Sequence, residues 1–314
     1  MTARVYSSYL KLYDSGELSR RVLLAKDRLA SCDICPRRCG VNRPEGEVGQ
    51  CAIGAQASVS SYGPHFGEEA PLVGSNGSGT VFFTNCNLKC VFCQNYAISQ
   101  LGEGELVTPR QLAAMMISLQ RRGCHNLNLV SPTHVVPQIL EALELAINAG
   151  FSLPLVYNTG GYDSLETLGL LEGIVDIYMP DMKYADKAVA RHYSGVKDYP
   201  QVNQAAVREM QRQVGDLEID QQGVARRGLM VRHLVLPNGL AGTDRVVAFL
   251  AQHVSRNTYV NIMAQYHPCY RAYDIAELAR PVSEADLAEA VRLAREQGLE
   301  RLDRLDDRLA IRFI

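Results

Sequence analysis

The sequence lacks the features of a membrane-spanning, secreted or nucleic-acid-coating protein. Its 314 residues carry a formal net charge of -2, which provides no strong field for nucleic acid or anionic membranes. The apolar stretch 168–179 is interrupted by Glu172 and Asp176, and no stretch reaches the roughly 20 residues that span a bilayer. The N-terminus contains no apolar run typical of a secretory signal. We therefore expect a cytoplasmic monomer without a nucleic-acid or membrane partner.

The sequence also lacks internal repeats, low-complexity tracts and any extreme of composition. With 47% apolar and 21% charged residues, it has the composition of a soluble globular enzyme. At roughly 100–200 residues per domain, this length allows one large domain or two ordinary ones.

The nine cysteines are unevenly distributed. Seven lie in two groups, Cys32, Cys35, Cys39 and Cys51, and then Cys86, Cys90 and Cys93. Cys124 and Cys269 stand apart, and packing inside the protein is the expected role of both. A reducing compartment disfavours disulfides, and an odd number of cysteines cannot pair completely. The two groups therefore indicate metal or iron–sulfur ligands.

Beyond residue 78, short runs of β-branched or aromatic residues alternate with helical segments. Strands are expected at 79–83, 126–131, 153–158, 174–179, 229–237 and 259–265. Helices are expected near 109–121, 135–149, 163–172, 244–255 and 283–297. Further helical segments are expected between the strand at 174–179 and about residue 216. Such alternation predicts a parallel sheet with helical crossovers. A full barrel has eight units, so six predict an α/β fold with a partial, TIM-like (β/α)6 barrel.

The first part of the chain has a different character. Apolar residues at helical spacing over 4–30 predict one or two helices, and an irregular segment with many glycines follows over 32–54. A Gly-, Ser- and Pro-rich connector then ends near residue 78. We expect an N-terminal helical and four-cysteine metal-binding segment over 1–78, and a barrel with a C-terminal helix over 79–314.

The motif TNCNLKCVFCQNY places Cys86, Cys90 and Cys93 directly after the first expected strand, with the spacing Cys-x3-Cys-x2-Cys. A tetrahedral zinc ion or a fully ligated [4Fe-4S] cluster takes four protein ligands, and no fourth cysteine is near this motif. Three thiolates on a four-iron cluster leave one iron open. The spacing therefore predicts a reactive cluster rather than a passive electron carrier.

This motif and others resemble the radical S-adenosylmethionine (SAM) superfamily. The resemblance covers about residues 32–271 and is to the branch described as pyruvate formate-lyase activating enzyme-like, here with an N-terminal four-cysteine module. The motifs are CDICPRRCGVNRPEGEVGQC, HFGEE, GSGTVFFTNCNLKCVFCQNYAIS, SPTHVVPQI, YNTGGY, YMPDMKY, RHLVLPN and QYHPCY. The resemblance implies that the open iron binds SAM and that the reduced cluster cleaves it to methionine and a 5′-deoxyadenosyl radical, which abstracts hydrogen from a substrate.

The resemblance also implies contacts between individual residues and the cofactor. Cys86, Cys90 and Cys93 would hold the cluster, and Phe92 would pack near the adenine of SAM. Ser131 and Thr133 stand where the family binds the amino group of the methionine moiety.

Four further positions follow later strands. Lys183 would pair with the SAM carboxylate and His267 would contact the ribose. Asn158 and Asp181 match positions that hold a monovalent cation in the activating enzymes, with Asn158 in place of a carboxylate.

The first cysteine group has the spacing Cys-x2-Cys-x3-Cys-x11-Cys. Cys32, Cys35, Cys39 and Cys51 would complete either a structural zinc site or a second iron–sulfur cluster, because both accept four thiolates. A short loop, isolated from the ends of the barrel strands, would favour zinc. A cluster that relays electrons is the alternative.

The leading functional hypothesis is a radical SAM enzyme that abstracts hydrogen from a protein, peptide or small-molecule substrate. Activation of a glycyl-radical enzyme is one form of it. An electron donor such as flavodoxin or ferredoxin would be a partner. The alternative is a non-catalytic iron–sulfur or zinc protein that transfers electrons or acts as a scaffold.

Overall fold

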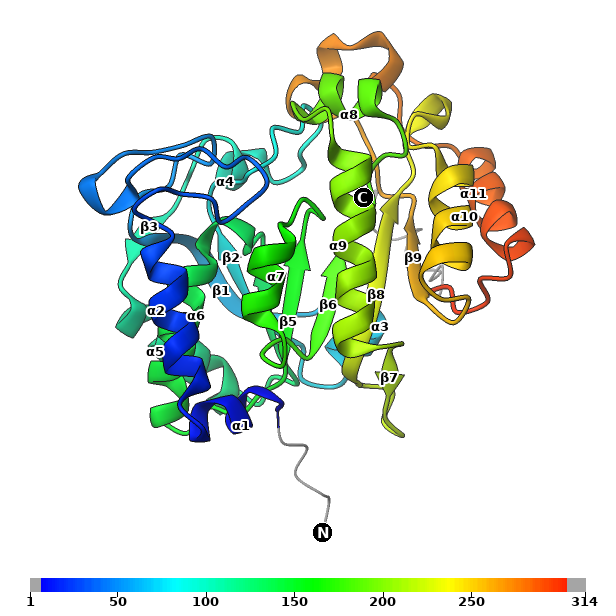
Figure 1. Ribbon diagram of the computed structural model, residues 1–314. Coiled ribbons are helices and arrows are strands. Elements are labelled where there is room, and N and C mark those ends of the chain that lie inside the picture. Colours follow the sequence, from blue (N-terminus) through cyan, green and yellow to red (C-terminus); the bar gives the residue numbers. More distant parts are fainter. Residues whose placement is uncertain (1–6, 304–314) are drawn as a thin grey trace.

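Six parallel strands form the barrel of the computed structural model, which describes residues 7–303 (Figure 1). They are β2 (Ser78–Phe83), β4 (Leu127–Val130), β5 (Leu155–Thr159), β6 (Ile177–Pro180), β8 (Ala225–Leu234) and β9 (Tyr259–Met263). Each pairs with the next in this order. In the described part of the chain no ladder joins β9 to β2, so the barrel stays open. The expected partial (β/α)6 architecture is confirmed.

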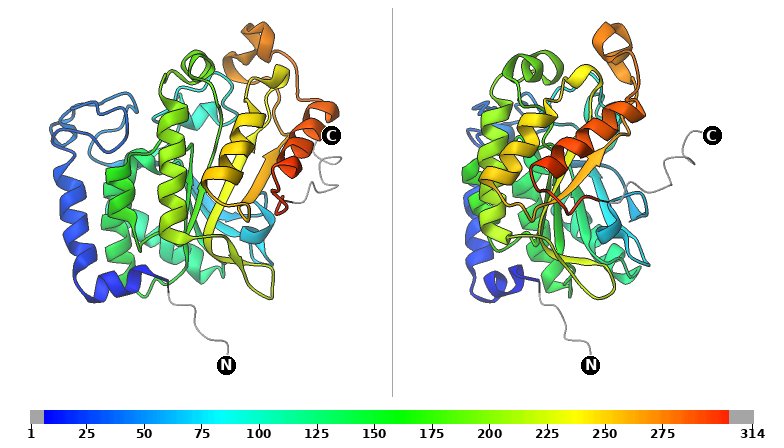
Figure 2. Two further views of the ribbon diagram at one scale, coloured as in Figure 1. Left: turned by 45° about the vertical axis from the view of Figure 1, so that its right-hand side comes forward. Right: turned by 90° about the vertical axis from the view of Figure 1, so that its right-hand side faces the viewer.

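Helices cover the outer face of this sheet (Figure 1). They are α5 (Pro109–Arg121), α6 (Val136–Asn148), α7 (Leu165–Leu171), α8 (Lys187–Ser194), α9 (Tyr199–Val214), α10 (Thr243–His253) and α11 (Glu284–Glu296). The last of these packs beside α10, as Figure 2 shows from two further sides. Among the described residues, no helix has both the length and the apolar character that a membrane span requires.

Local sequence explains where these elements begin and why they are buried. Helix α5 starts at a capping box, in which Thr108 and Gln111 exchange hydrogen bonds between side chain and backbone. Pro109 occupies its first turn, where a missing N–H costs no helical hydrogen bond. Strands β5 and β6 are buried along their whole length, because helices cover one face and the barrel interior the other.

The N-terminal segment forms α1 (Tyr9–Asp14) and α2 (Glu17–Asp27), as expected, although residues 4–6 lie outside the described range. Helix α2 packs along α6 (Figure 1). The chain then enters an irregular loop over 28–56, at the same end of the sheet as the carboxyl ends of the barrel strands (Figure 1).

The expected connector before residue 78 is wrong in part, because it contains a long strand. Strand β1 (Ala57–His65) pairs antiparallel with β2, and β3 (Glu105–Val107) pairs with the start of β1. The strand is hard to recognise in the sequence because it contains Pro64, which cannot donate a backbone hydrogen bond. Proline is tolerated there because β3 pairs only with residues 57–59 of β1. The sheet therefore draws strands from both sides of residue 78, and the division into two domains stays a prediction.

Over residues 7–303, three further short elements lie between those already named, in addition to five 3-10 helices in the loops. They are α3 (Ala70–Val73), α4 (Tyr96–Ser99) and β7 (Glu218–Ile219), which pairs antiparallel with β8. Of the two isolated cysteines, Cys124 is buried in the core, as expected, and Cys269 is partly exposed.

Candidate active site

The carboxyl ends of the six parallel strands surround a cavity of about 210 Å³. Its wall includes Cys86, Cys90, Phe92, Cys93, Ser131, Asn158, Asp181, Lys183, Arg232 and Gln265. These residues come from the loops or ends of all six strands, because carboxyl ends of parallel strands meet at one edge of a sheet. The fold therefore brings eight of the ten residues expected around the cluster and SAM to one space.

The cysteine loop that follows β2 is fixed by backbone hydrogen bonds on several sides. Asn85 has a φ of 65°, a left-handed conformation that turns the chain sharply out of the strand. Beyond it, the Lys89 N–H donates to the Ser194 carbonyl at 3.1 Å, and the Val91 N–H donates to the Tyr193 carbonyl at 2.8 Å. The end of α8 thus holds the loop over the cavity.

The three thiols of this loop have polar neighbours that suit thiolate ligands. The Sγ atoms of Cys90 and Cys93 each lie 3.0 Å from a serine hydroxyl, that of Ser194 and Ser99 respectively. Burial and the neighbouring Cys90 raise the pKa of Cys86 to about 12. Burial also raises the pKa of Cys90, although the Lys183 ammonium opposes the shift. Both thiols therefore keep their protons at neutral pH until a metal displaces them.

A charged network also lines the cavity. The Lys183 ammonium donates to Asp181 Oδ2 at 2.5 Å, and Arg232 Nε donates to Asp181 Oδ1 at 2.8 Å. Burial alone would raise the pKa of Asp181, but Arg232 and Lys183 hold it below its ordinary value. Burial lowers the pKa of Lys183, and Asp181 more than reverses this, so the net shift is upward. The network is therefore ionised throughout, with two cations on one carboxylate.

Arg232 is the charged cavity residue that sequence reasoning missed. Its Nη2 donates to Asn158 Oδ1 at 2.8 Å while its Nε contacts Asp181. A guanidinium thus lies between the two residues at which the resemblance implies a bound cation. A signal was available in the sequence, since Arg232 interrupts the apolar run of the strand LMVRHLVLP. A charge inside a buried strand rarely occurs without a partner.

Two expected cofactor residues do not line the cavity. Thr133 is buried, and its hydroxyl donates to Asp163 Oδ1 at 2.7 Å, so it braces the loop after β4. His267 is exposed at the cavity rim, with its Nδ1 lying 3.4 Å from Gln94 Nε2. By contrast, Phe92 is well placed, because it packs between the rings of Tyr184 and Tyr266 and faces the cavity.

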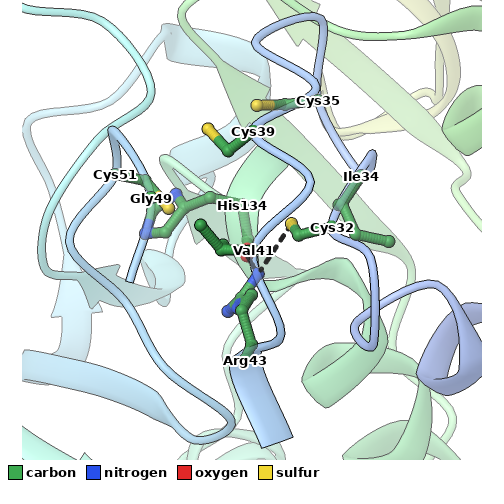
Figure 3. Close-up of a pocket in the computed structure, with 9 residues that line it drawn as sticks. All are labelled: Cys32, Ile34, Cys35, Cys39, Val41, Arg43, Gly49, Cys51 and His134. Atoms are coloured by element: carbon green, nitrogen blue, oxygen red, sulfur yellow. Dashed lines mark hydrogen bonds between the residues drawn. The ribbon is translucent and has the colours of Figure 1, made fainter. Parts of the chain in front are cut away.

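The four N-terminal cysteines line one small pocket (Figure 3). Its volume is about 10 Å³, and Arg43, His134 and Gly49 also contribute to its wall. A Cβ on Gly49 would lie 2.8 Å from Cys39 Sγ, so only glycine leaves room for that thiol. Within residues 7–303, no group of three or more His, Cys, Asp or Glu side chains is arranged so that it could hold a metal ion. Binding of one metal ion would therefore bring the thiols closer together than they lie here.

The expected isolation of this module from the barrel strand ends is wrong. Arg37 Nε donates to the carbonyl of Asn87, inside the cysteine loop after β2, at 2.9 Å. Arg43 Nη1 donates to the carbonyl of His134, just after β4, at 2.9 Å. The sequence does not reveal these contacts, because α2 carries the loop the length of the barrel before it folds over the strand ends (Figure 1).

Comparisons with known proteins agree with this architecture. The family model of the radical SAM superfamily matches residues 80–216. The chain is 32% identical to uncharacterized protein MJ0674 of Methanocaldococcus jannaschii, over 90% of this chain and 80% of that protein. Uncharacterized protein MJ0808 of the same organism is 24% identical, over 87% of this chain and 80% of that protein.

Among solved structures, the fold resembles a radical SAM methyltransferase from Sphaerobacter thermophilus, with a TM-score of 0.50 and 16% identity. The likeness covers 70% of this chain and 64% of that one, so this chain spans just under two thirds of the methyltransferase. A cavity at the carboxyl ends of a partial barrel, with three cysteines in its first loop, is the architecture of a radical SAM protein. This chain belongs to the radical SAM superfamily.

Proposed function

We propose that this protein holds a [4Fe-4S] cluster on Cys86, Cys90 and Cys93 and binds SAM in the adjoining cavity. With one electron from a donor protein, the two groups when bound would supply methionine and a 5′-deoxyadenosyl radical, which abstracts hydrogen from a substrate. The observation that carries the proposal is the joint presence of three thiols and a charged network around one cavity, with no other cysteine among its lining residues. Three ligands leave the fourth iron for SAM, and the network supplies charges for the amino acid part of SAM.

Each protein group has a distinct task in this proposal. The Lys183 ammonium faces the SAM carboxylate, because its charge is fixed by Asp181 and it lines the cavity. Ser131 accepts a hydrogen bond from the amino group, and Phe92 packs against the adenine. Arg232 holds Asp181 in place through Oδ1, whereas Lys183 contacts Oδ2. His267 is left to contact the ribose from the rim.

The non-catalytic alternative gains little from the structure. An electron carrier or scaffold has no need of a 210 Å³ cavity beside its cluster. Nor does it need an ionised Asp181 and Lys183 pair in the cavity wall. The proposed substrate is a protein, a peptide or a small molecule, with glycyl-radical enzyme activation as the case suggested by the resemblance.

The test is anaerobic reconstitution with iron and sulfide, followed by dithionite reduction in the presence of SAM. The expected product is 5′-deoxyadenosine, measured by chromatography. Changing Cys86, Cys90 or Cys93 to Ala should abolish its release. The matched control is Cys124→Ala, which alters a buried cysteine that does not line the cavity. Release by the triple cysteine variant would refute the proposal, and an iron-loaded protein that never cleaves SAM would favour the carrier.

We further propose that Cys32, Cys35, Cys39 and Cys51 bind a single structural zinc ion. Support comes from the small size of their pocket, about 10 Å³ against about 210 Å³ for the cavity after β2. A four-iron cluster occupies more space than one zinc ion, so the smaller pocket favours zinc. The N-terminal module lies next to the cysteine loop after β2, and this proximity favours the alternative of an electron-relay cluster.

Metal analysis of the Cys86, Cys90 and Cys93 triple Ala variant separates the two metals. A zinc site should give about one zinc per chain, and a second cluster about four irons per chain. Neither metal above background would refute the N-terminal centre. Because a four-thiolate metal contributes folding energy, chelation should also lower the melting temperature of this variant.

A further inference from the structure

Arg43 is a buried cation that no carboxylate pairs with in the described part of the chain. Arg43 is only 1% exposed to solvent. Nε donates to the carbonyl of Gly54 at 2.8 Å and Nη1 to the carbonyl of His134 at 2.9 Å, while Nη2 has no partner. Neutral carbonyls satisfy part of its hydrogen-bonding capacity but leave its charge uncompensated. Such burial is unfavourable unless an opposite charge is brought close.

The groups nearest to this charge are the four thiols of the N-terminal pocket. Arg43 lines that pocket, and its Nη1 lies 3.9 Å from Cys32 Sγ. Figure 3 shows the guanidinium at one side of the space that the four cysteine side chains surround. Pocket and cation are therefore parts of one arrangement.

Charge arithmetic explains why the two belong together. Four thiolates around one divalent ion carry a net charge of about minus two, which is itself costly to bury. One adjacent guanidinium halves that charge and can donate to a thiolate. We propose, resting on the zinc centre above, that Arg43 is the built-in counter-charge of the four-thiolate centre and a determinant of its metal affinity.

Arg43 also connects the module to the barrel. The His134 carbonyl that it binds belongs to a residue whose ring Nε2 donates to the carbonyl of Thr84 at 2.9 Å. Thr84 follows β2 and lies two positions before Cys86. A purely structural tether is therefore the rival role for Arg43, and the test must separate charge from tethering.

The experiment measures zinc affinity by competition with a chromogenic chelator, in the full chain with Cys86, Cys90 and Cys93 all changed to Ala. Arg43→Gln keeps hydrogen-bond donors and removes the charge, whereas Arg43→Lys keeps the charge. Arg43→Gln should weaken zinc binding by about 10- to 100-fold, the usual effect of losing a partner of metal ligands, and Arg43→Lys by less. The matched control is Arg38→Gln, because Arg38 lies in the same module but is exposed and paired with Glu166.

Melting temperatures with and without zinc give the second measurement. Arg43→Gln should lower the melting temperature of the zinc-loaded chain and raise that of the metal-free chain, where the unpaired charge is gone. An equal loss in both states, or a chain that cannot fold even without metal, would identify a tether and overturn the charge role. If Arg43→Gln binds zinc as tightly as the parent, the charge role is overturned, but the proposed zinc centre is not. Absence of zinc from the parent would instead overturn the centre.

Discussion

The guanidinium of Arg232 and the carboxylate of Asp181 lie 2.8 Å apart in the wall of the cysteine-lined cavity. The Arg232 side chain is 18% exposed and that of Asp181 is 11% exposed, so the pair is largely screened from water. Because Asp181 also accepts from Lys183, Arg232 fixes the carboxylate that positions the proposed SAM-binding lysine. Interactions of this kind are costly to break from one side only.

Replacing Arg232 by Met should therefore destabilise the protein strongly. Asp181 would keep one cation, but Asn158 Oδ1 would lose its donor and the buried Glu69 would lose the cation 3.9 Å from its Oε1. The expected loss is about 3–5 kcal/mol in the free energy of unfolding. Urea unfolding followed by circular dichroism measures this loss. The control is Arg226→Met, from the same strand, whose side chain is 31% exposed in its ion pair with Asp220. If Arg232→Met is as stable as the control variant, Arg232 does not stabilise the buried network as proposed.

Lys183 and His267 should contribute unequally to SAM binding. A charge-assisted hydrogen bond is worth about 1.5–3 kcal/mol, so Lys183→Ala should weaken SAM binding by roughly one to two orders of magnitude. His267 lies exposed at the rim, and His267→Ala should cost less. Equilibrium titration of the reconstituted proteins with SAM measures both. Both variants should retain their iron, and wild-type affinity in both would show that the residue roles implied by the resemblance are wrong.

Gly161 should tolerate no side chain. Its φ is +76°, and an added Cβ would lie 2.1 Å from the carbonyl oxygen of Asp181. Gly161→Ala should thus displace the Asp181 loop and lower both thermal stability and SAM affinity. Gly169→Ala is the matched control, since nothing lies within 4 Å of a Cβ there and the site is inside α7. Gly169→Ala should raise stability by up to about 1 kcal/mol. A Gly161→Ala variant with wild-type melting temperature and SAM affinity would contradict the prediction.

Stability should fall as the pH drops below about 6.5, in part because of His233. Burial lowers the pKa of His233, and hydrogen bonding to the Met182 carbonyl does not offset this. The unfolded chain therefore takes up a proton at a higher pH than the native protein does. The His233 contribution is complete above the unfolded pKa and is lost as the pH falls toward the lower native pKa.

Urea unfolding of wild type and His233→Gln between pH 7 and 5 checks this dependence. A single proton limits the slope contributed by His233 to about 1.4 kcal/mol per pH unit. His233→Gln should have a shallower slope than wild type. Identical slopes for His233→Gln and wild type would contradict the prediction.

The sequence by itself determined the barrel and the cysteine loop. Six buried strands can be located because runs such as LPLVYN are apolar on both faces and are followed by helical periodicity. Cys86, Cys90 and Cys93 can be picked out as candidate ligands because three cysteines within eight residues can reach one metal centre whatever the rest of the chain does. Local spacing carries this information.

Tertiary structure decided what depends on contacts between distant segments. Strand β1 is stabilised by pairing with β2, which compensates for a sequence containing Pro64. Arg232 became a cavity residue through Asp181 and Asn158, 51 and 74 positions away. Arg43 lies against His134, 91 positions later, and brings the four-cysteine module onto the barrel. Charge pairing at such separations leaves no periodic pattern, because it depends on burial and geometry that only the folded chain creates.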